Sequence, residues 1–121
     1  MLSFRLILAS NSPRRQAFFK LLGVPFEAIT AEVDETPVSG ESPVQMVRRL
    51  SLAKARAVAD GADGPALVVG SDTTVVFEEQ MLGKPSSVEE ARRMLLTLRD
   101  RPHEVHTGVS IVATGQESEV T

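Results

Sequence analysis

Two adjacent arginines, Arg14 and Arg15, stand in the first turn of a predicted helix, directly after a short Ser/Asn segment. A helix N-terminus carries partial positive charge and ordinarily attracts acidic side chains rather than basic ones. Its free backbone N–H groups bind anions, however, and arginine donates paired hydrogen bonds that suit phosphate oxygens. We therefore interpret residues 10–15 as an anion site, with two exposed surface arginines as the alternative.

Lys54 lies on the apolar face of another predicted helix, where a charged side chain is uncommon because burying its charge costs free energy. At helical spacing this face also holds Val47, Leu50, Ala57 and Val58. The lysine either extends along the apolar surface to reach water or reaches into a cleft. The pattern leaves both alternatives open.

Asp72 interrupts the apolar run LVVGSDTTVVF, which otherwise reads as a strand, and aspartate is depleted in strands. A carboxylate in such a place needs a metal, a cation or hydrogen-bond donors as a partner. The alternative is a turn that begins at Gly70 and Ser71. The sequence therefore indicates either a functional carboxylate or a turn residue at position 72.

An acidic loop and a further lysine complete the set of charged residues. Glu32, Asp34 and Glu35 lie in a segment rich in turn residues, which is most often a solvated loop, and Lys84 lies in a Gly-Lys-Pro break that by itself indicates a turn. Together the charged residues place cations and carboxylates near strand ends. That combination suits a polyphosphate with a divalent cation, because magnesium takes one or two carboxylates plus phosphate oxygens.

Strands that alternate with helices must position these side chains, and this order predicts an α/β fold with a layered mixed β-sheet flanked by helices. We expect strands at 4–9, 25–31, 65–77, within 78–85, at 103–115 and within 115–121, and helices at 12–23, 42–60 and 87–100. The strand at 65–77 is either continuous or bulged.

Capping residues mark where the three helices begin. Ser12 precedes Pro13 at the first predicted helix, Ser42 with Gln45 forms a capping box, and Ser87 repeats the Ser-x-x-Glu pattern. The faces expected to turn inward are Ala17, Phe18, Leu21 and Leu22 on the first helix and Ala91, Met94, Leu95 and Leu98 on the third.

Composition excludes several classes of function. The 121 residues include no cysteine, which rules out disulfides and thiolate metal sites, and the longest apolar run is too short to cross a membrane. No basic segment precedes the apolar N-terminus, so we expect a core strand there rather than a signal peptide. We also expect the protein to be cytoplasmic. A net charge of −3 and only five aromatic residues argue against nucleic-acid binding.

Five segments resemble, in order, the Maf family of septum-formation-inhibitor-like nucleoside triphosphate pyrophosphatases. They are LILASNSPRRQAFFKLLGVPFEAI followed by VDET, then LAKARAV, VVGSDTTVVFEEQMLGKP, EEARRMLLTL and HEVHTGVSIV. The resemblance runs from about residue 5 to about residue 113. It implies an ITPase-like fold with a cleft between two lobes, hydrolysis of nucleoside triphosphates to monophosphate and pyrophosphate, and a divalent cation, Mg²⁺ or Mn²⁺.

The resemblance also implies roles for individual residues. Phosphates are expected to bind Ser10, Arg14, Arg15, Lys54 and Lys84. Thr73 and Arg14 bear on substrate choice, Glu35 positions the metal, and Asp72 accepts a proton from water, binds the metal, or does both.

The Arg-Arg pair favours the branch acting on dTTP and UTP, with 7-methyl-GTP or a non-catalytic regulator of cell division as alternatives. The resemblance allows a homodimer. Because the chain is shorter than the family's usual length, we expect residues 1–121 to form the N-terminal two thirds of a single Maf-like domain.

Overall fold

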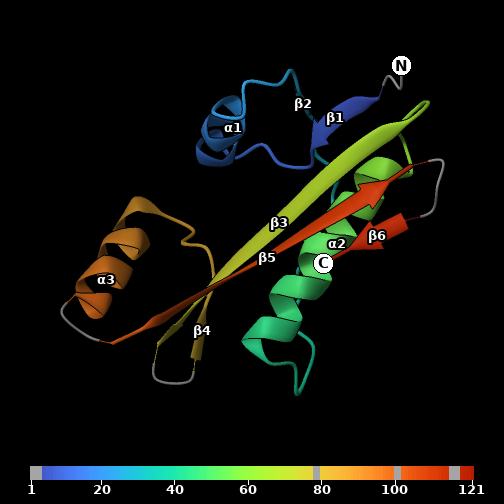
Figure 1. Cartoon of the computed structure of the whole chain (residues 1–121). Helices are drawn as coiled ribbons and strands as arrows, with labels where there is room; N and C mark the ends of the chain where they lie inside the picture. Colours follow the sequence, from blue (N-terminus) through green and yellow to red (C-terminus); the bar gives the residue numbers. More distant parts are fainter. Residues whose placement is uncertain (1–3, 78–79, 100–101, 115–117) are drawn as a thin grey trace.

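The computed structural model describes residues 4–77, 80–99, 102–114 and 118–121, and in these residues six strands form one mixed sheet with three helices (Figure 1). The strands are β1 (Arg5–Leu8), β2 (Glu27–Ala28), β3 (Ala66–Phe77), β4 (Gln80–Leu82), β5 (Glu104–Ala113) and β6 (Ser118–Val120). The helices are α1 (Pro13–Lys20), α2 (Pro43–Ala59) and α3 (Val88–Leu98). The predicted α/β fold class is confirmed.

Strand order is β2-β1-β3-β5-β6, with β4 also paired to β3. β1 is parallel to β2 and β3, whereas β3 is antiparallel to both β4 and β5. Because β5 accompanies β3 from Leu67 to Val76, β1 and β4 must share the other edge of β3. The last β1 pair is Leu8–Val69 and the first β4 pair is Leu82–Val75, so no strand of the described residues lies beside residues 70–74 of β3 on that edge.

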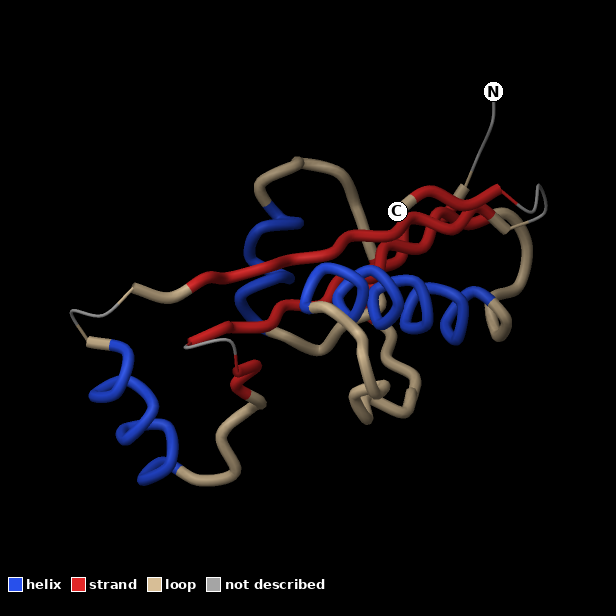
Figure 2. Tube along the Cα trace, turned by 90° about the horizontal axis from the view of Figure 1, so that it is seen from below, coloured by secondary structure: helices blue, strands red, loops and turns tan. Residues whose placement is uncertain are grey.

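Helix α2 covers one face of the sheet and packs directly on the backbone of β3 and β5 (Figure 2). A Cβ atom added at Gly70 would lie 2.3 Å from the carbonyl oxygen of Ser51, and one at Gly108 would lie 2.4 Å from that of Val47. Only glycine permits these approaches, since real Cβ atoms do not come so close to backbone atoms. The hydroxyls of Ser51 and Ser110 meet between the layers at 2.7 Å.

The apolar core lies between α2 and the sheet, and its fully buried side chains include Ile7, Ala55 and Val68. The capping box that begins α2 is confirmed, because the Ser42 hydroxyl accepts from the Gln45 N–H while the Gln45 side chain accepts from the Ser42 N–H. The strongest sequence signals for local structure therefore coincide with the best-buried element.

The expectation that α1 and α3 bury their apolar faces is wrong for most of the residues concerned. Phe18, Leu21 and Leu22 are 65%, 81% and 61% exposed, Ala17 is exposed as well, and α3 contains no buried residue, with Leu95 70% exposed. Figure 1 shows the reason: α3 stands beside β4, at the far end of the sheet from the α2-covered core. Periodicity indicates that a face needs cover but not what supplies it.

Other element boundaries are narrower than expected. The strand predicted at 25–31 has only the two residues of β2, and the first helix ends at Lys20, before Gly23 with its positive φ of 70°. The strand predicted at 65–77 is continuous, without a bulge. The turns expected around 78–79 and 115–117, and the end of the third helix at residue 100, fall outside the described residues.

Candidate functional site

A cavity of about 540 Å³ opens where β1 and β3 part, beside the unpaired edge of β3. Its walls come from the segment after β1, the segment after β2, helix α2 and the residue before Pro85, and the lining residues are Ala9, Ser10, Asn11, Ser12, Arg15, Thr30, Ala31, Glu32, Val33, Glu35, Lys54 and Lys84. Chains that diverge beyond the carboxyl ends of parallel strands commonly leave a ligand-binding crevice there. The topology thus explains why a cavity forms here.

Lys54 joins two carboxylates from different parts of the chain. Its Nζ lies 3.0 Å from Oε1 of Glu35 and 3.0 Å from Oδ1 of Asp72. Glu35 and Lys54 line the cavity, whereas Asp72, which is 6% exposed, pairs with the 15% exposed Lys54 side chain without lining the cavity itself. The alternative in which Lys54 merely extends to water is wrong, and Asp72 lies within a strand rather than in a turn.

The packing of α2 on β3 explains this meeting. Asp72 is two residues beyond Gly70 on β3, so its side chain points to the same face, toward α2. Lys54 precedes Ala55, whose backbone nitrogen lies 2.8 Å from the position of a Cβ at Gly70. The close approach at Gly70 therefore sets the register that brings the ammonium to the carboxylate.

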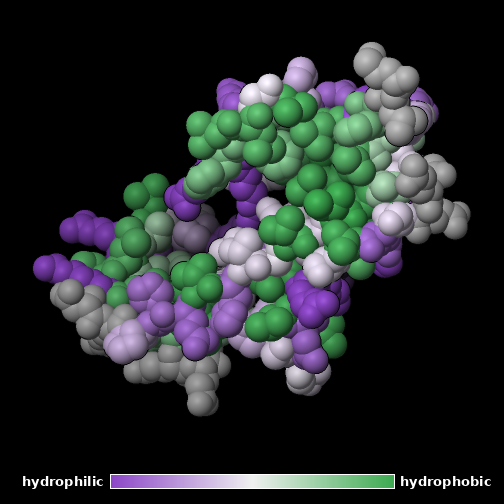
Figure 3. Space-filling model, in the orientation of Figure 1, coloured by the Kyte–Doolittle hydropathy of each residue, from purple (hydrophilic) through white to green (hydrophobic). Residues whose placement is uncertain are grey.

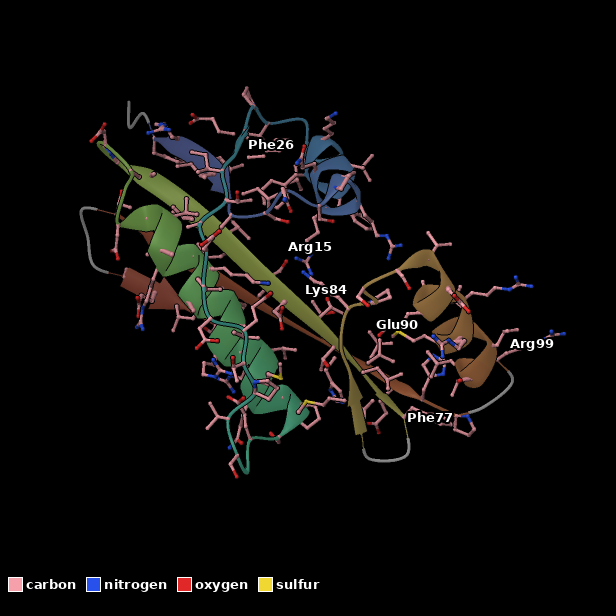
Figure 4. All side chains as sticks on the ribbon, turned by 180° about the vertical axis from the view of Figure 1, so that it is seen from behind. Arg15, Phe26, Phe77, Lys84, Glu90 and Arg99 are labelled. Atoms are coloured by element: carbon pink, nitrogen blue, oxygen red, sulfur yellow. The ribbon has the colours of Figure 1, made fainter. Side chains whose placement is uncertain are left out.

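Arg15 bridges from α1 to the unpaired edge of β3. Its Nη1 donates to the backbone oxygen of Ser71 at 3.3 Å, and its Nη2 donates to Oγ1 of Thr73 at 3.4 Å. Thr73 in turn contacts the hydroxyl of Thr107 at 3.0 Å. Figure 4 shows Arg15 and Lys84 pointing toward one another, from α1 and from the segment between β4 and α3. Two cations thus face each other across the cavity.

The turn before α1 uses its own hydroxyls to satisfy backbone donors. Ser10 is buried and its Oγ accepts from the Ser12 N–H at 3.0 Å, while the Ser12 Oγ accepts from the Arg15 N–H at 3.4 Å. Arg14 is exposed and does not line the cavity. Of the two adjacent arginines, the structure therefore brings only Arg15 to the cavity.

Charges at the cavity are balanced. Arg15, Lys54 and Lys84 line the cavity together with the carboxylates of Glu32 and Glu35, and Asp72 adds a third carboxylate through its ion pair with Lys54. The hydrogen bond from Lys54 lowers the pKa of Glu35 most, and the positive charges of Lys54, Lys84 and Arg15 lower it further. Glu35 is consequently ionised at neutral pH and available as a hard oxygen ligand.

The donor set fits a divalent cation that arrives with phosphates. Glu35 and Asp72 converge on one point, and one or two carboxylates are what magnesium takes from a protein when phosphates complete its ligands. Within the described residues, no three His, Asp or Glu side chains form a group that holds a metal by themselves. The residues thus fit a metal shared with a ligand rather than a metal held by protein alone.

Sequence reasoning missed part of this site. Thr30 lines the cavity although no role was expected for it, whereas Asn11 and Ser12 belong to the segment interpreted as an anion site. No sequence signal marked Thr30, because it lay inside the strand predicted at 25–31, and β2 in fact ends at Ala28. Arg49 was not among the expected residues, yet it pairs with Glu41 and contacts the loop that carries Glu35.

Comparison with known proteins identifies the family of this chain. Residues 5–121 match the model of a family described as Maf-like protein. The chain belongs to the Maf-like family. The dTTP/UTP pyrophosphatases of Bacillus cereus (strain AH820) and Bacillus anthracis are Maf relatives that are 49% identical to this chain over 109 residues. That of Bacillus cereus (strain B4264) is 47% identical.

These alignments cover 90% of this Maf-like chain but 56% of each relative, so the chain spans little more than half the length of the curated relatives it matches. A solved structure of a nucleoside-triphosphatase, or dITP/XTP pyrophosphatase, from Mycobacterium abscessus has a TM-score of 0.57 at 19% identity. The structural match covers 97% of this chain and 69% of the Mycobacterium abscessus chain, which supports the ITPase-like α/β fold. No described helix of the Maf-like chain combines the length and apolar character that a membrane span requires.

Proposed function

We propose that this chain carries the phosphate-binding and catalytic part of a nucleoside triphosphate pyrophosphatase that converts dTTP and UTP to the monophosphate and pyrophosphate. The observation that carries the proposal is the contact of Lys54 with both Glu35 and Asp72 at 3.0 Å, beside a cavity that also receives Arg15 and Lys84. Relatives named dTTP/UTP pyrophosphatase at 49% identity support the substrate choice.

In the reaction, water attacks the α-phosphorus, the bond from that phosphorus to the bridging oxygen breaks, and pyrophosphate leaves. Asp72 is proposed to accept the proton of the attacking water, a task that a carboxylate performs within hydrogen-bond reach. Arg15 and Lys84 donate to phosphate oxygens, where fixed donors stabilise developing negative charge. A divalent cation held by Glu35 and Asp72 supplies further charge neutralisation when bound.

Charge balance supports the need for that cation. The cavity lining and the Asp72 carboxylate paired with Lys54 together carry three cations and three carboxylates, so a triphosphate brings negative charge that the protein alone does not neutralise. Lys54 is proposed to turn from the carboxylates to phosphate oxygens when nucleotide and metal are bound. Ser10 holds the turn before α1, and Arg14, which is exposed, is proposed to act at the outer rim.

Substrate choice is proposed to involve Thr73, which Arg15 already contacts. The length of the relatives supports the proposal that residues 1–121 are the N-terminal part of one Maf-like domain. Cytoplasmic location and a homodimer stay predictions.

Pyrophosphate release by the full-length protein tests the proposal. With Mg²⁺ or Mn²⁺ present, dTTP and UTP should be hydrolysed faster than other nucleotides, and Asp72→Asn should lower turnover by about 10²-fold or more. Asp60→Asn, a change at the exposed C-cap of α2, is the matched control and should leave turnover unchanged. Preference for 7-methyl-GTP would overturn the substrate choice, and nucleotide binding without pyrophosphate release would indicate a regulator instead of an enzyme.

A further inference from the structure

Glu35 stands on a loop that nothing in its own secondary structure holds in place. Residues 29–42 form neither helix nor strand, and the Glu35 side chain is 45% exposed. Burial therefore does not fix the carboxylate, and its ion pair with Lys54 restrains the side chain but not the backbone of the loop. Some other contact must restrain the backbone near residue 35.

Arg49 of α2 supplies that contact. Its Nε and Nη2 hold the two carboxylate oxygens of Glu41 at 2.6 and 2.9 Å, and Nη2 also donates to the backbone oxygen of Thr36 at 3.3 Å. Thr36 follows Glu35 directly, so fixing its carbonyl restrains the position of the preceding residue. The planar guanidinium makes all three bonds at once because its donors lie in a rigid fork.

Glu41 extends this restraint along the loop. Its side chain is 8% exposed, and its Oε1 also accepts from the N–H of Val38 at 3.3 Å. The hydrogen bond from Arg49 holds the pKa of Glu41 below its usual range, so the carboxylate keeps its charge at neutral pH. Arg49 and Glu41 thus clamp the loop at Thr36 and at Val38, on the C-terminal side of Glu35.

We propose that Arg49, acting through Thr36 and Glu41, is a positioning residue that holds the Glu35 carboxylate where a divalent cation binds. This inference rests on the proposed function only in assigning a metal to Glu35. Residues that orient a metal ligand from outside typically change metal affinity by 10- to 100-fold when removed. Arg49 and Glu41 are therefore expected to act as one unit on metal binding.

The test is titration of the full-length protein with Mn²⁺ at a fixed concentration of inorganic pyrophosphate, which supplies the phosphate ligands, followed by electron paramagnetic resonance of the Mn²⁺ that the protein does not bind. Arg49→Gln and Glu41→Gln should each weaken Mn²⁺ binding by about 10-fold, and the double variant should be no weaker than either single one, since both changes remove the same restraint. Arg49→Lys keeps the positive charge but removes the paired guanidinium donors, so Mn²⁺ binding should weaken less in this variant than in Arg49→Gln.

Arg56→Gln is the matched control. Arg56 lies on the same helix and makes a comparable two-nitrogen pair, but its partner is Glu119 of β6 rather than a residue of the 29–42 loop. Mn²⁺ binding should be unchanged in this variant. Hydrogen exchange of the 29–42 segment, measured without metal or nucleotide, should quicken in Arg49→Gln and stay the same in Arg56→Gln.

Unchanged Mn²⁺ affinity in Arg49→Gln, Arg49→Lys and Glu41→Gln would overturn the inference, as would unchanged exchange of the loop. Wild-type pyrophosphate release, measured on the same preparation, separates this from the proposed function. A protein that loses Mn²⁺ affinity in these variants but releases no pyrophosphate would retain the positioning role and refute the enzymatic one. If the wild type releases pyrophosphate and the variants bind Mn²⁺ as tightly as the wild type, the enzymatic role would stand and the positioning role would be refuted.

Discussion

Lys54 of α2 and Asp72 of β3 form an ion pair of 3.0 Å, with the carboxylate almost fully buried. The two residues come from different layers of the fold and meet because Gly70 lets the helix backbone rest on the strand. Glu35 shares the same ammonium at 3.0 Å. Lysine therefore occupies the point where two carboxylates converge, and its removal has a definite consequence.

We predict that Lys54→Met destabilises the protein more than Asp72→Asn does. Without the ammonium, two carboxylates face each other with no cation between them, whereas Asp72→Asn leaves Lys54 paired with Glu35. Breaking a fully buried pair costs about 3–5 kcal/mol, and the half-exposed Glu35 should reduce this to about 2 kcal/mol here. Urea unfolding of both variants measures the difference.

Magnesium provides the control for this prediction. If the carboxylates form a cation site, Mg²⁺ should raise the melting temperature of Lys54→Met more than that of wild type, because the ion replaces the missing charge. An equal shift in the two proteins would contradict the convergence of Glu35 and Asp72 on one cation.

The two adjacent arginines should differ in their effect on turnover. Arg15 lines the cavity and rests on Ser71 and Thr73, whereas Arg14 is exposed outside the lining. Arg15→Lys should lower kcat/KM by about 10-fold or more. The single ammonium of lysine cannot hydrogen-bond to β3 and also donate two parallel hydrogen bonds to phosphate. Arg14→Lys should lower it less. Steady-state pyrophosphate release compares them, and a larger loss at Arg14 would refute the assignment.

Gly70→Ala and Gly108→Ala should each destabilise the fold through contact with α2. The added methyl would lie 2.3 Å from the Ser51 oxygen or 2.4 Å from the Val47 oxygen, and both are backbone atoms that cannot turn aside. Overpacking of this kind costs about 1–3 kcal/mol. Gly61→Ala is the control, because its nearest neighbour would be at 3.9 Å. Thermal melts of the three variants should separate the first two from the third.

Stability should fall in acid through three glutamates, Glu27, Glu41 and Glu119. Arginine hydrogen bonds lower the pKa of each in the folded protein. Their contribution is complete above the unfolded pKa of about 4.3 and is lost as pH falls through the lower folded pKa. Substituting all three by glutamine should flatten the decline of unfolding free energy between about pH 5 and 3. An equally steep decline in the triple variant would place the acid sensitivity elsewhere.

Local signals predicted the elements well where burial and capping agree. The Ser42–Gln45 box and the apolar stripe located α2, and β-branched runs located β3 and β5, because these segments make their own core. The expected burial of Phe18 and Leu95 failed for the opposite reason. Helical periodicity indicates that an apolar face favours burial, but no described element packs on these two faces.

The site was predictable as a set of residues but not as an arrangement. Lys54 and Asp72 were conspicuous because charge is rare among apolar neighbours, yet their pairing depends on how α2 is seated at Gly70. Arg49 gave no signal, since its partner Glu41 precedes the helix and one ion pair among many charged residues is not visible in sequence. The family resemblance implied the roles of these residues, whereas the distances between them follow from the packing of α2 on β3.

The backbone contact between α2 and β3 also separates two properties of the cavity. Lys54 and Asp72 are held by main-chain packing, whereas the opposite walls, which include Thr30, Glu32 and Lys84, come from segments outside any helix or strand. Substitutions in those walls can alter the shape of the ligand that enters without changing the distance between the ammonium and the buried carboxylate. The outline of this part of the cavity and the Lys54–Asp72 pair are thus encoded in different stretches of the chain, so one can vary during evolution while the other is kept.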